Sequence, residues 1–197
     1  MVSLVTESHC VLLLLFDKKQ MLRFLVVVND RQGYTKISSS YTRRLVSLLN
    51  VRDGLDVVDV MFAETRNLPL PDVRHYDAVL LGGSSAIPTS ASSLGKYNIE
   101  IHKACVEAKI PCVCICYAAQ VVAEAHGGYV IKKRAHRHKG CTPQHTWHDH
   151  SYIITKPPST EAIEVVDIDE HTLAVQHHPS MSKAGIQQLI HFLRRKI

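Results

Sequence analysis

The sequence contains no apolar run long enough to cross a membrane, so no membrane protein is expected. The longest run, in "CVLLLLFDKKQ", is short, and no basic residue precedes it as in a targeting signal. Also missing are a Gly-x-x-x-x-Gly-Lys-Ser/Thr phosphate loop and a Ser-Gly-Gly-x-Asp-Ser motif, so no ATP site is expected. Six cysteines, three of them crowded together, do not resemble a secreted disulfide framework. They indicate a reducing, cytoplasmic setting.

The chain of 197 residues is 46% hydrophobic and shows no repeat or linker, which predicts one globular domain. Its net charge of +5 is spread over scattered residues and local clusters such as "KKRAHRHK". That charge could attract an anionic ligand or an acidic partner, but it is too diffuse to indicate nucleic-acid binding. We expect the domain to cover residues 21–197. Residues 1–20 are either an N-terminal extension upstream of a start at Met21 or an added edge strand.

Short apolar runs alternate with amphipathic segments through most of the chain. The pattern predicts a three-layer, flavodoxin-like α/β fold, with a mainly parallel sheet and helices on both faces. The predicted strands are residues 23–29, 55–62, 76–83 and 111–116, and the predicted helices are 38–50, 97–110 and 182–196. Shorter strand-like pieces between Gly128 and Gln176 are residues 129–133, 151–155, 163–168 and 172–176.

Ligands of open α/β sheets sit at the carboxyl ends of the strands. This rule selects Gly82 and Gly83, Cys116, and the "QHHPS" segment that follows "TLAV". Cys116 lies between a strand and a helix, as a nucleophile elbow does, and the helix N-terminus favours its thiolate. Cys112 and Cys114 lie inside the strand and are interpreted as small buried hydrophobes.

Four segments show further similarity to known sequences: "CICYAAQVVAEAHGG", "LAVQHHPSMSKAGIQQLIHFL", "LLGGSSA" and "TWHDHSYIITKPP". They resemble, in order, the nucleophile segment, the His-Pro-Glu segment with the closing helix, the Gly-Gly oxyanion loop, and a Trp-x-x-His stretch. The four segments named here are those of class I glutamine amidotransferases. The Trp-x-x-His stretch is seen in the glutaminase part of GMP synthetase. The resemblance runs in family order from about residue 22 to the C-terminus.

The resemblance implies a glutaminase in which Cys116 attacks the side-chain amide of glutamine and His178 acts as base and then acid. The N–H groups of Gly83 and Tyr117 would stabilise the oxyanion. The remaining implied residues are Gly82, Gln120 and His150 for substrate binding and Ser180 at the position of the family's catalytic Glu. No cofactor or metal is implied, and ammonia would pass to an ATP-dependent synthase partner.

The sequence departs from the family pattern at the elbow, at Ser180, and between residues 128 and 173. Cys114 and Ala118 replace two elbow glycines, where side chains crowd a strained turn. Ser180 replaces the Glu that orients the histidine, so we expect weak activity that Ser180→Glu would raise about tenfold. The segment from 128 to 173 is short for the family.

Other functions stay open from the sequence. Imidazole and thiolate bind zinc, so the "HRHKGCTPQHTWHDH" segment is a candidate metal site, although its spacing matches no regular ligand pair. Its candidate ligands are His136, His138, Cys141, His145, His148 and His150. A degenerate amidotransferase that only binds a partner or metabolite and a hydrolase of other γ-glutamyl amides are the remaining alternatives. We favour the glutaminase, as a subunit or domain similar to that of GMP synthetase.

Overall fold

In the computed structural model, the described part of the chain comprises residues 21–29, 40–49, 56–63, 69–132, 138–141, 147–150, 152–155, 163, 165–166 and 168–197. For residues 40, 138–141 and 147–150 the description covers the backbone alone. Residues 1–20 lie outside the described part, so both interpretations of that segment stay open.

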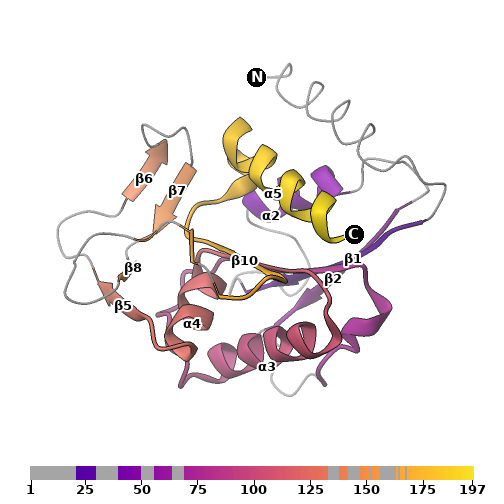
Figure 1. The fold of residues 1–197 in the computed structure, drawn as a ribbon. Coiled ribbons are helices and arrows are strands. Elements are labelled where there is room, and N and C mark those ends of the chain that lie inside the picture. Colours follow the sequence, from indigo (N-terminus) through magenta and orange to yellow (C-terminus); the bar gives the residue numbers. More distant parts are fainter. Residues whose placement is uncertain are drawn as a thin grey trace.

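A six-stranded sheet forms the centre of the fold, in the order β2-β1-β3-β4-β10-β9 (Figure 1). Neighbouring strands pair in parallel except β9, which is antiparallel to β10. The bounds are β1 Arg23–Val28, β2 Val57–Phe62, β3 Ala78–Leu81, β4 Cys112–Ile115, β9 Val165–Val166 and β10 Thr172–Val175. Strands β3, β4 and β10 are fully buried and apolar apart from Thr172, as expected for parallel strands that are covered on both faces. The predicted mainly parallel, flavodoxin-like sheet is confirmed.

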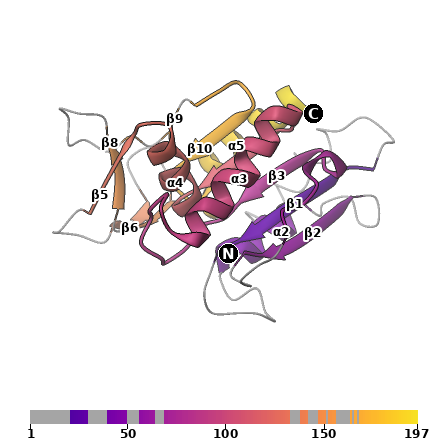
Figure 2. The ribbon, with the colours of Figure 1, turned by 90° about the horizontal axis from the view of Figure 1, so that it is seen from below.

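Helices cover both faces of this sheet, which confirms the predicted three layers (Figure 2). On one face, α2 (Ser40–Leu49) and α5 (Lys183–Lys196) pack their apolar side chains against those of β1, β3, β4 and β10. On the other, α3 (Ser93–Ala108) and α4 (Tyr117–Ala125) enclose a second apolar cluster. The carboxyl ends of β1, β3, β4 and β10 therefore share one edge of a sheet that is held rigidly from both sides.

The chain after α4 forms two small antiparallel pairs beside the main sheet. β5 (Tyr129–Lys132) pairs with β8 (Tyr152–Thr155), and β6 (His138–Cys141) pairs with β7 (Trp147–His150). The sequence pattern predicted strand-like pieces at β5 and β8 but did not predict the β6–β7 pair. Helix α3 begins four residues before its predicted start, because the Ser92 side chain accepts a hydrogen bond from the Gly95 N–H and caps it.

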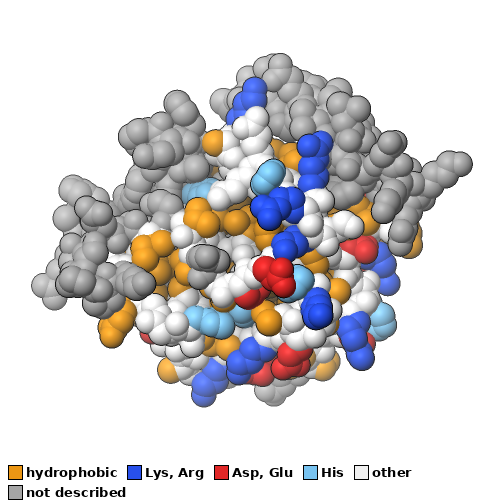
Figure 3. Space-filling model, in the orientation of Figure 1, with side chains coloured by type: hydrophobic (Ala, Val, Ile, Leu, Met, Phe, Trp, Pro, Cys, Tyr) orange, Lys and Arg blue, Asp and Glu red, His pale blue; other side chains and the backbone are white. Residues whose placement is uncertain are grey.

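The outer face of α5 is basic, and Figure 3 shows Lys and Arg side chains gathered over this helix. Three of them, Arg194, Arg195 and Lys196, lie in the last turn, where positive charge interacts favourably with the helix dipole. Among the described helices, none is both long and apolar enough to cross a bilayer.

Candidate active site

Cys116 connects β4 to α4 with a backbone that non-glycine residues rarely adopt, at φ 52° and ψ −105°. Its N–H donates to Val175 O of β10 at 2.8 Å, and its carbonyl accepts from the Gln120 N–H at 3.0 Å. Such a conformation costs about 1–3 kcal/mol and persists only where the surroundings impose it. The strand-turn-helix context predicted for a nucleophile is present, with the thiol at the N-terminus of α4.

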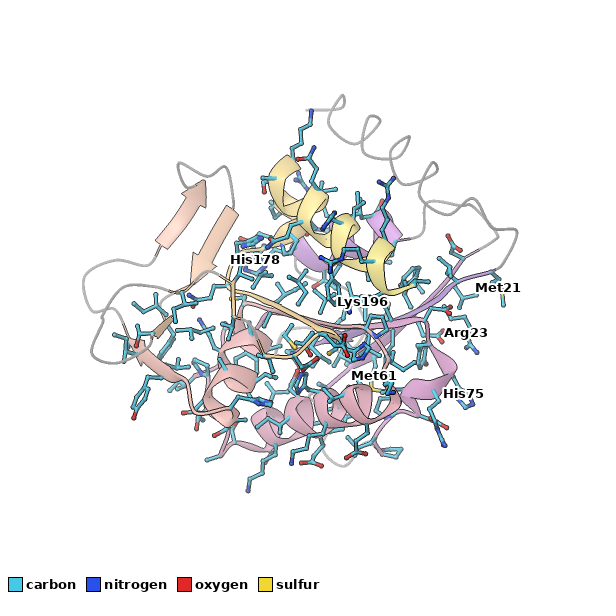
Figure 4. The ribbon with its side chains drawn as sticks, viewed as in Figure 1. Met21, Arg23, Met61, His75, His178 and Lys196 are labelled. Atoms are coloured by element: carbon cyan, nitrogen blue, oxygen red, sulfur yellow. The ribbon has the colours of Figure 1, made fainter. Side chains whose placement is uncertain are left out.

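Gly83 is the point at which the candidate residues converge. A Cβ atom built on Gly83 would lie 3.1 Å from His178 Cε1, 3.3 Å from Cys116 Cβ and 3.8 Å from Cys116 Sγ. The thiol and the imidazole therefore border the same backbone segment, and a larger residue at position 83 would press on both. Figure 4 shows His178 after β10, in the connection that leads to α5. The structure thus brings together Cys116, His178 and Gly83, as the resemblance implied.

The Gly82–Gly83 peptide is fixed by a pair of buried asparagines. Asn29 Nδ2, at the end of β1, donates to Gly82 O and to Asn98 Oδ1, both at 2.8 Å. Asn98 Nδ2 of α3 donates to Asn29 Oδ1 at 3.0 Å and to Leu94 O at 2.8 Å. Because the C=O and N–H of a trans peptide point in opposite directions, holding Gly82 O fixes the direction of the Gly83 N–H. Sequence reasoning missed this pair, although Asn29 stands at the carboxyl end of a predicted strand.

The loop after Gly83 is tied to α4 as well. The Glu124 carboxylate accepts a hydrogen bond from the Ser90 N–H. The Tyr117 hydroxyl lies 3.5 Å from Ser92 Oγ, and the side chain is buried. As the first residue of α4, Tyr117 places its N–H at the positive end of the helix dipole. This position is compatible with its predicted oxyanion role, which stays a prediction.

Gln120 is 3% exposed and makes hydrogen bonds within the fold, and its predicted role in substrate binding stays a prediction. Its side-chain nitrogen donates to Tyr152 O at 2.7 Å and to Gln176 Oε1 at 3.4 Å. Gln176 in turn accepts from the Ile154 N–H at 2.9 Å and donates to Ile163 O at 2.7 Å. The two amides attach β8 to the main sheet, so any contact of Gln120 with glutamine would have to use its Oε1.

Ser180 is buried in the short 3-10 helix η2 (Pro179–Met181) that follows His178. Its hydroxyl donates to the backbone carbonyl of Tyr41 on α2 at 3.0 Å. The Tyr41 ring also stacks on the His178 imidazole, with ring centroids 4.2 Å apart and planes inclined by 23°. The catalytic role that the resemblance implied for Ser180 stays a prediction. The contact with Tyr41 was not visible in the sequence.

Cys105, Cys112 and Cys114, whose side chains the structure describes, are packed in the core between β4 and α3. Cys112 Sγ lies 3.8 Å from Cys114 Sγ, and both side chains are fully buried, as is Cys105. A hydrogen bond with Cys112 and burial raise the pKa of Cys105. For Cys112, the bond with Cys105 lowers the pKa, but the bond with Cys114 and burial raise it well above the usual value. The structure supports the interpretation of Cys112 as an inert hydrophobe.

Cys114 and Ala118, the side chains at the two elbow-glycine positions, both point into the cluster enclosed by α3 and α4. Cys116 itself belongs to the cluster on the opposite face, beneath α2 and α5. The two larger residues are therefore accommodated on the far side of the sheet from the thiol. The effect of these two replacements on activity stays a prediction.

His177, the neighbour of His178, is 1% exposed. Burial lowers its pKa to about 4, and the Gln188 side chain opposes this shift. The folded chain therefore holds His177 neutral at pH values where the unfolded chain binds a proton. Stability conferred by the neutral imidazole is complete above the unfolded pKa and is lost as the pH falls toward the folded pKa.

Acidification from pH 7 to pH 4 is expected to lower the free energy of unfolding by about 3 kcal/mol through His177 alone. Urea unfolding of the wild type and His177→Gln at pH 7, 5.5 and 4 tests this expectation. The difference in stability between the two chains should shift in favour of the variant as the pH falls. Parallel losses in both chains would show that another group is responsible.

The candidate zinc ligands, which include His150, fall on the β6–β7 pair or between its strands in the sequence, except His136, which precedes β6. The backbone register places His138 opposite His150 and Gly140 opposite His148. The side chains of these residues lie outside the described part of the chain. The substrate-binding role of His150 and the zinc hypothesis therefore both stay untested.

Comparison with known proteins agrees with this geometry. Residues 36–192 match the family model described as glutamine amidotransferase class-I. No curated protein sequence is significantly similar to the chain. A solved structure from Thermoplasma acidophilum, assigned as one of the subunits of GMP synthase, aligns with a TM-score of 0.61 at 18% identity, over 88% of this chain and 93% of that one.

A glutamine amidotransferase from Thermotoga maritima aligns with a TM-score of 0.59 at 12% identity, over 86% of this chain and 81% of the other. One from Methylobacillus flagellatus gives 0.55 at 14% identity, over 86% and 74% of the two chains. At these identities the structural likeness concerns the fold, whereas the family model covers most of the sequence. The chain therefore belongs to the class I glutamine amidotransferase family.

Proposed function

We propose that this chain is a glutaminase that releases ammonia for a separate ATP-dependent synthase subunit in the cytoplasm. The observation that carries the proposal is the convergence of Cys116, His178 and Gly83 at the carboxyl edge of the sheet. The strained elbow backbone of Cys116 supports it, because such strain recurs at catalytic nucleophiles.

In the proposed reaction, Cys116 Sγ loses its proton to His178 and bonds to the amide carbon of glutamine. The Gly83 and Tyr117 N–H groups stabilise the resulting oxyanion, a contribution of about 3 kcal/mol per donor. The carbon–nitrogen bond then breaks, and the proton held by His178 leaves with the ammonia. Water attacks the γ-glutamyl thioester and releases glutamate and the free thiol.

The synthase part of GMP synthetase is the first partner to test, given the Trp-x-x-His resemblance and the likeness to the Thermoplasma acidophilum structure assigned to GMP synthase. Because no phosphate loop or pyrophosphatase motif occurs in the sequence, activation of the ammonia acceptor is assigned to the partner.

Ammonia release from glutamine by the purified chain, with and without that synthase partner and its nucleotide substrates, tests the proposal. We expect slow hydrolysis alone and faster hydrolysis in the complex, because docking would order the loops around Gly83 and His178. A γ-glutamyl anilide serves as the comparison substrate. Preferential cleavage of the anilide, with equal rates with and without the synthase, would indicate a hydrolase of other γ-glutamyl amides. A chain inert toward both substrates in the complex would indicate a binding protein.

A further inference from the structure

Tyr41 and Ser180 together connect the loop of His178 to helix α2. The Ser180 hydroxyl donates to Tyr41 O at 3.0 Å, and the Tyr41 ring stacks on the imidazole of His178 at a centroid distance of 4.2 Å. We propose that Tyr41 is the positioning residue of His178, replacing the carboxylate that would come from position 180. This inference rests on the proposed function for the role of His178, and on the geometry alone for the effect of Tyr41.

The segment that follows His178 packs against a helix on each side. Helix α2, which carries Tyr41, is anchored in the core by buried Leu45, Leu48 and Leu49. On the opposite side, α5 approaches so closely that a Cβ on Gly185 would lie 2.7 Å from Pro179 Cα and from Pro179 O. The segment that follows His178 is therefore held between α2 and α5, with the Tyr41 ring against the imidazole face.

Stacking can replace part of what a carboxylate does. A carboxylate accepts a ring N–H and stabilises the imidazolium by its charge, whereas an aromatic face attracts the cation through its quadrupole. The stack contacts the face of the imidazole and leaves both ring nitrogens in the plane, where hydrogen bonds to other groups can form. Tyr41 would thus fix the plane of the His178 ring and favour its protonated form.

Other titratable and charged groups around His178 on the described elements are few. The Cys116 thiol shares the contact with Gly83, and His177 is buried next to His178 in sequence. Arg43 and Arg44 on α2 and Lys183 on α5 are exposed. Their charges are therefore screened by solvent, and the ring of Tyr41 is the group in direct stacking contact.

The test measures the pKa of His178 by NMR in a Cys116→Ala chain, in which no thiolate couples to the imidazole. The signal of His178 is the one missing from the His178→Gln chain. We expect Tyr41→Leu to lower this pKa by about 0.5 pH units and Tyr41→Phe to leave it unchanged. Tyr41→Met is the second non-aromatic variant if the leucine chain folds poorly. Tyr97→Leu, on α3 and bonded to Pro69 O, is the matched control that should not shift it.

Glutaminase kinetics of the chain with Cys116 intact give the second readout. Tyr41→Leu should reduce kcat about two- to fivefold with KM unchanged, and Tyr41→Phe should restore the rate. Ser180→Glu should reduce the rate and not raise it, because a carboxylate cannot donate to Tyr41 O. This expectation replaces the tenfold gain inferred from the sequence alone.

The outcomes separate the two hypotheses. An unchanged or raised pKa in Tyr41→Leu, or a phenylalanine variant that behaves like leucine, would overturn the role of Tyr41. An inactive wild type whose His178 pKa still depends on the aromatic ring would refute the glutaminase and leave the role of Tyr41 established. A gain in rate with Ser180→Glu would show that a carboxylate orients His178 better than the contact with Tyr41 does.

Discussion

Cys116→Ala is expected to reduce glutamine hydrolysis by at least about ten-thousandfold, because it removes the thiol proposed to form the thioester. A glutamine-like diazo-ketone reacts with the nucleophile itself, so it should not label the Cys116→Ala chain at all. Mass spectrometry of the labelled peptide and an ammonia assay measure the two effects. The fold should survive, since alanine removes only the sulfur.

Cys112→Ala and Cys114→Ala are the matched controls for this result, because both thiols lie on the same strand as the elbow. Both face the interior cluster on the other side of the sheet and should leave labelling intact. Label found on Cys112 or Cys114 in the wild type would mean that the elbow has been assigned to the wrong residue.

Asn29→Asp is the second change for which we expect a large effect. Aspartate has the same shape but no amide hydrogens, so the bonds to Gly82 O and Asn98 Oδ1 are lost. A carboxylate would then face two oxygen atoms at a position that is 0% exposed. We expect a loss of about 3–5 kcal/mol of stability, measured by urea unfolding, from the unpaired buried charge.

The same change should slow glutamine hydrolysis about a hundredfold or more, because the Gly83 N–H would lose its orientation toward the oxyanion. Alkylation of Cys116 by iodoacetamide forms no oxyanion and should continue at the rate of the wild type. Asn98→Asp, which perturbs the same pair but leaves the donor to Gly82 O, is the control. Asn98→Asp should lower the free energy of unfolding about as much as Asn29→Asp does, but should reduce the rate of glutamine hydrolysis less. If both reactions slow equally in Asn29→Asp, the effect is a general disturbance of the site.

The parts of this site that could be predicted from the sequence are those governed by local pattern. The strand runs, the helix after Cys116 and the rule on carboxyl ends were sufficient to place the thiol, the glycine pair and His178 at one edge. Contacts between distant segments could not be predicted in this way. Asn29 and Asn98 are 69 positions apart, and Ser180 and Tyr41 are 139 apart. The helical pattern of α2 indicates which face of the helix is buried. It does not indicate that Tyr41 on this helix contacts Ser180, which lies far along the chain.

The two adjacent histidines, His177 and His178, could not be told apart from the local sequence pattern either. His177 and His178 are chemically identical in the sequence, and only the resemblance distinguished them. In the structure, His178 borders Gly83 and Tyr41, whereas His177 is almost fully buried and its pKa responds to Gln188 of α5. The difference arises because the chain turns directly after β10, so that successive side chains point to different surroundings.

The asparagine pair has a consequence for how acidity and salt act on this protein. Its four amide hydrogen bonds are all made to oxygen atoms of the chain, and neither side chain can ionise. The frame that holds the Gly83 N–H is therefore insensitive to proton concentration and to ionic strength over the range in which the fold is intact. A pH dependence of a reaction at this edge therefore originates in groups other than the asparagine pair.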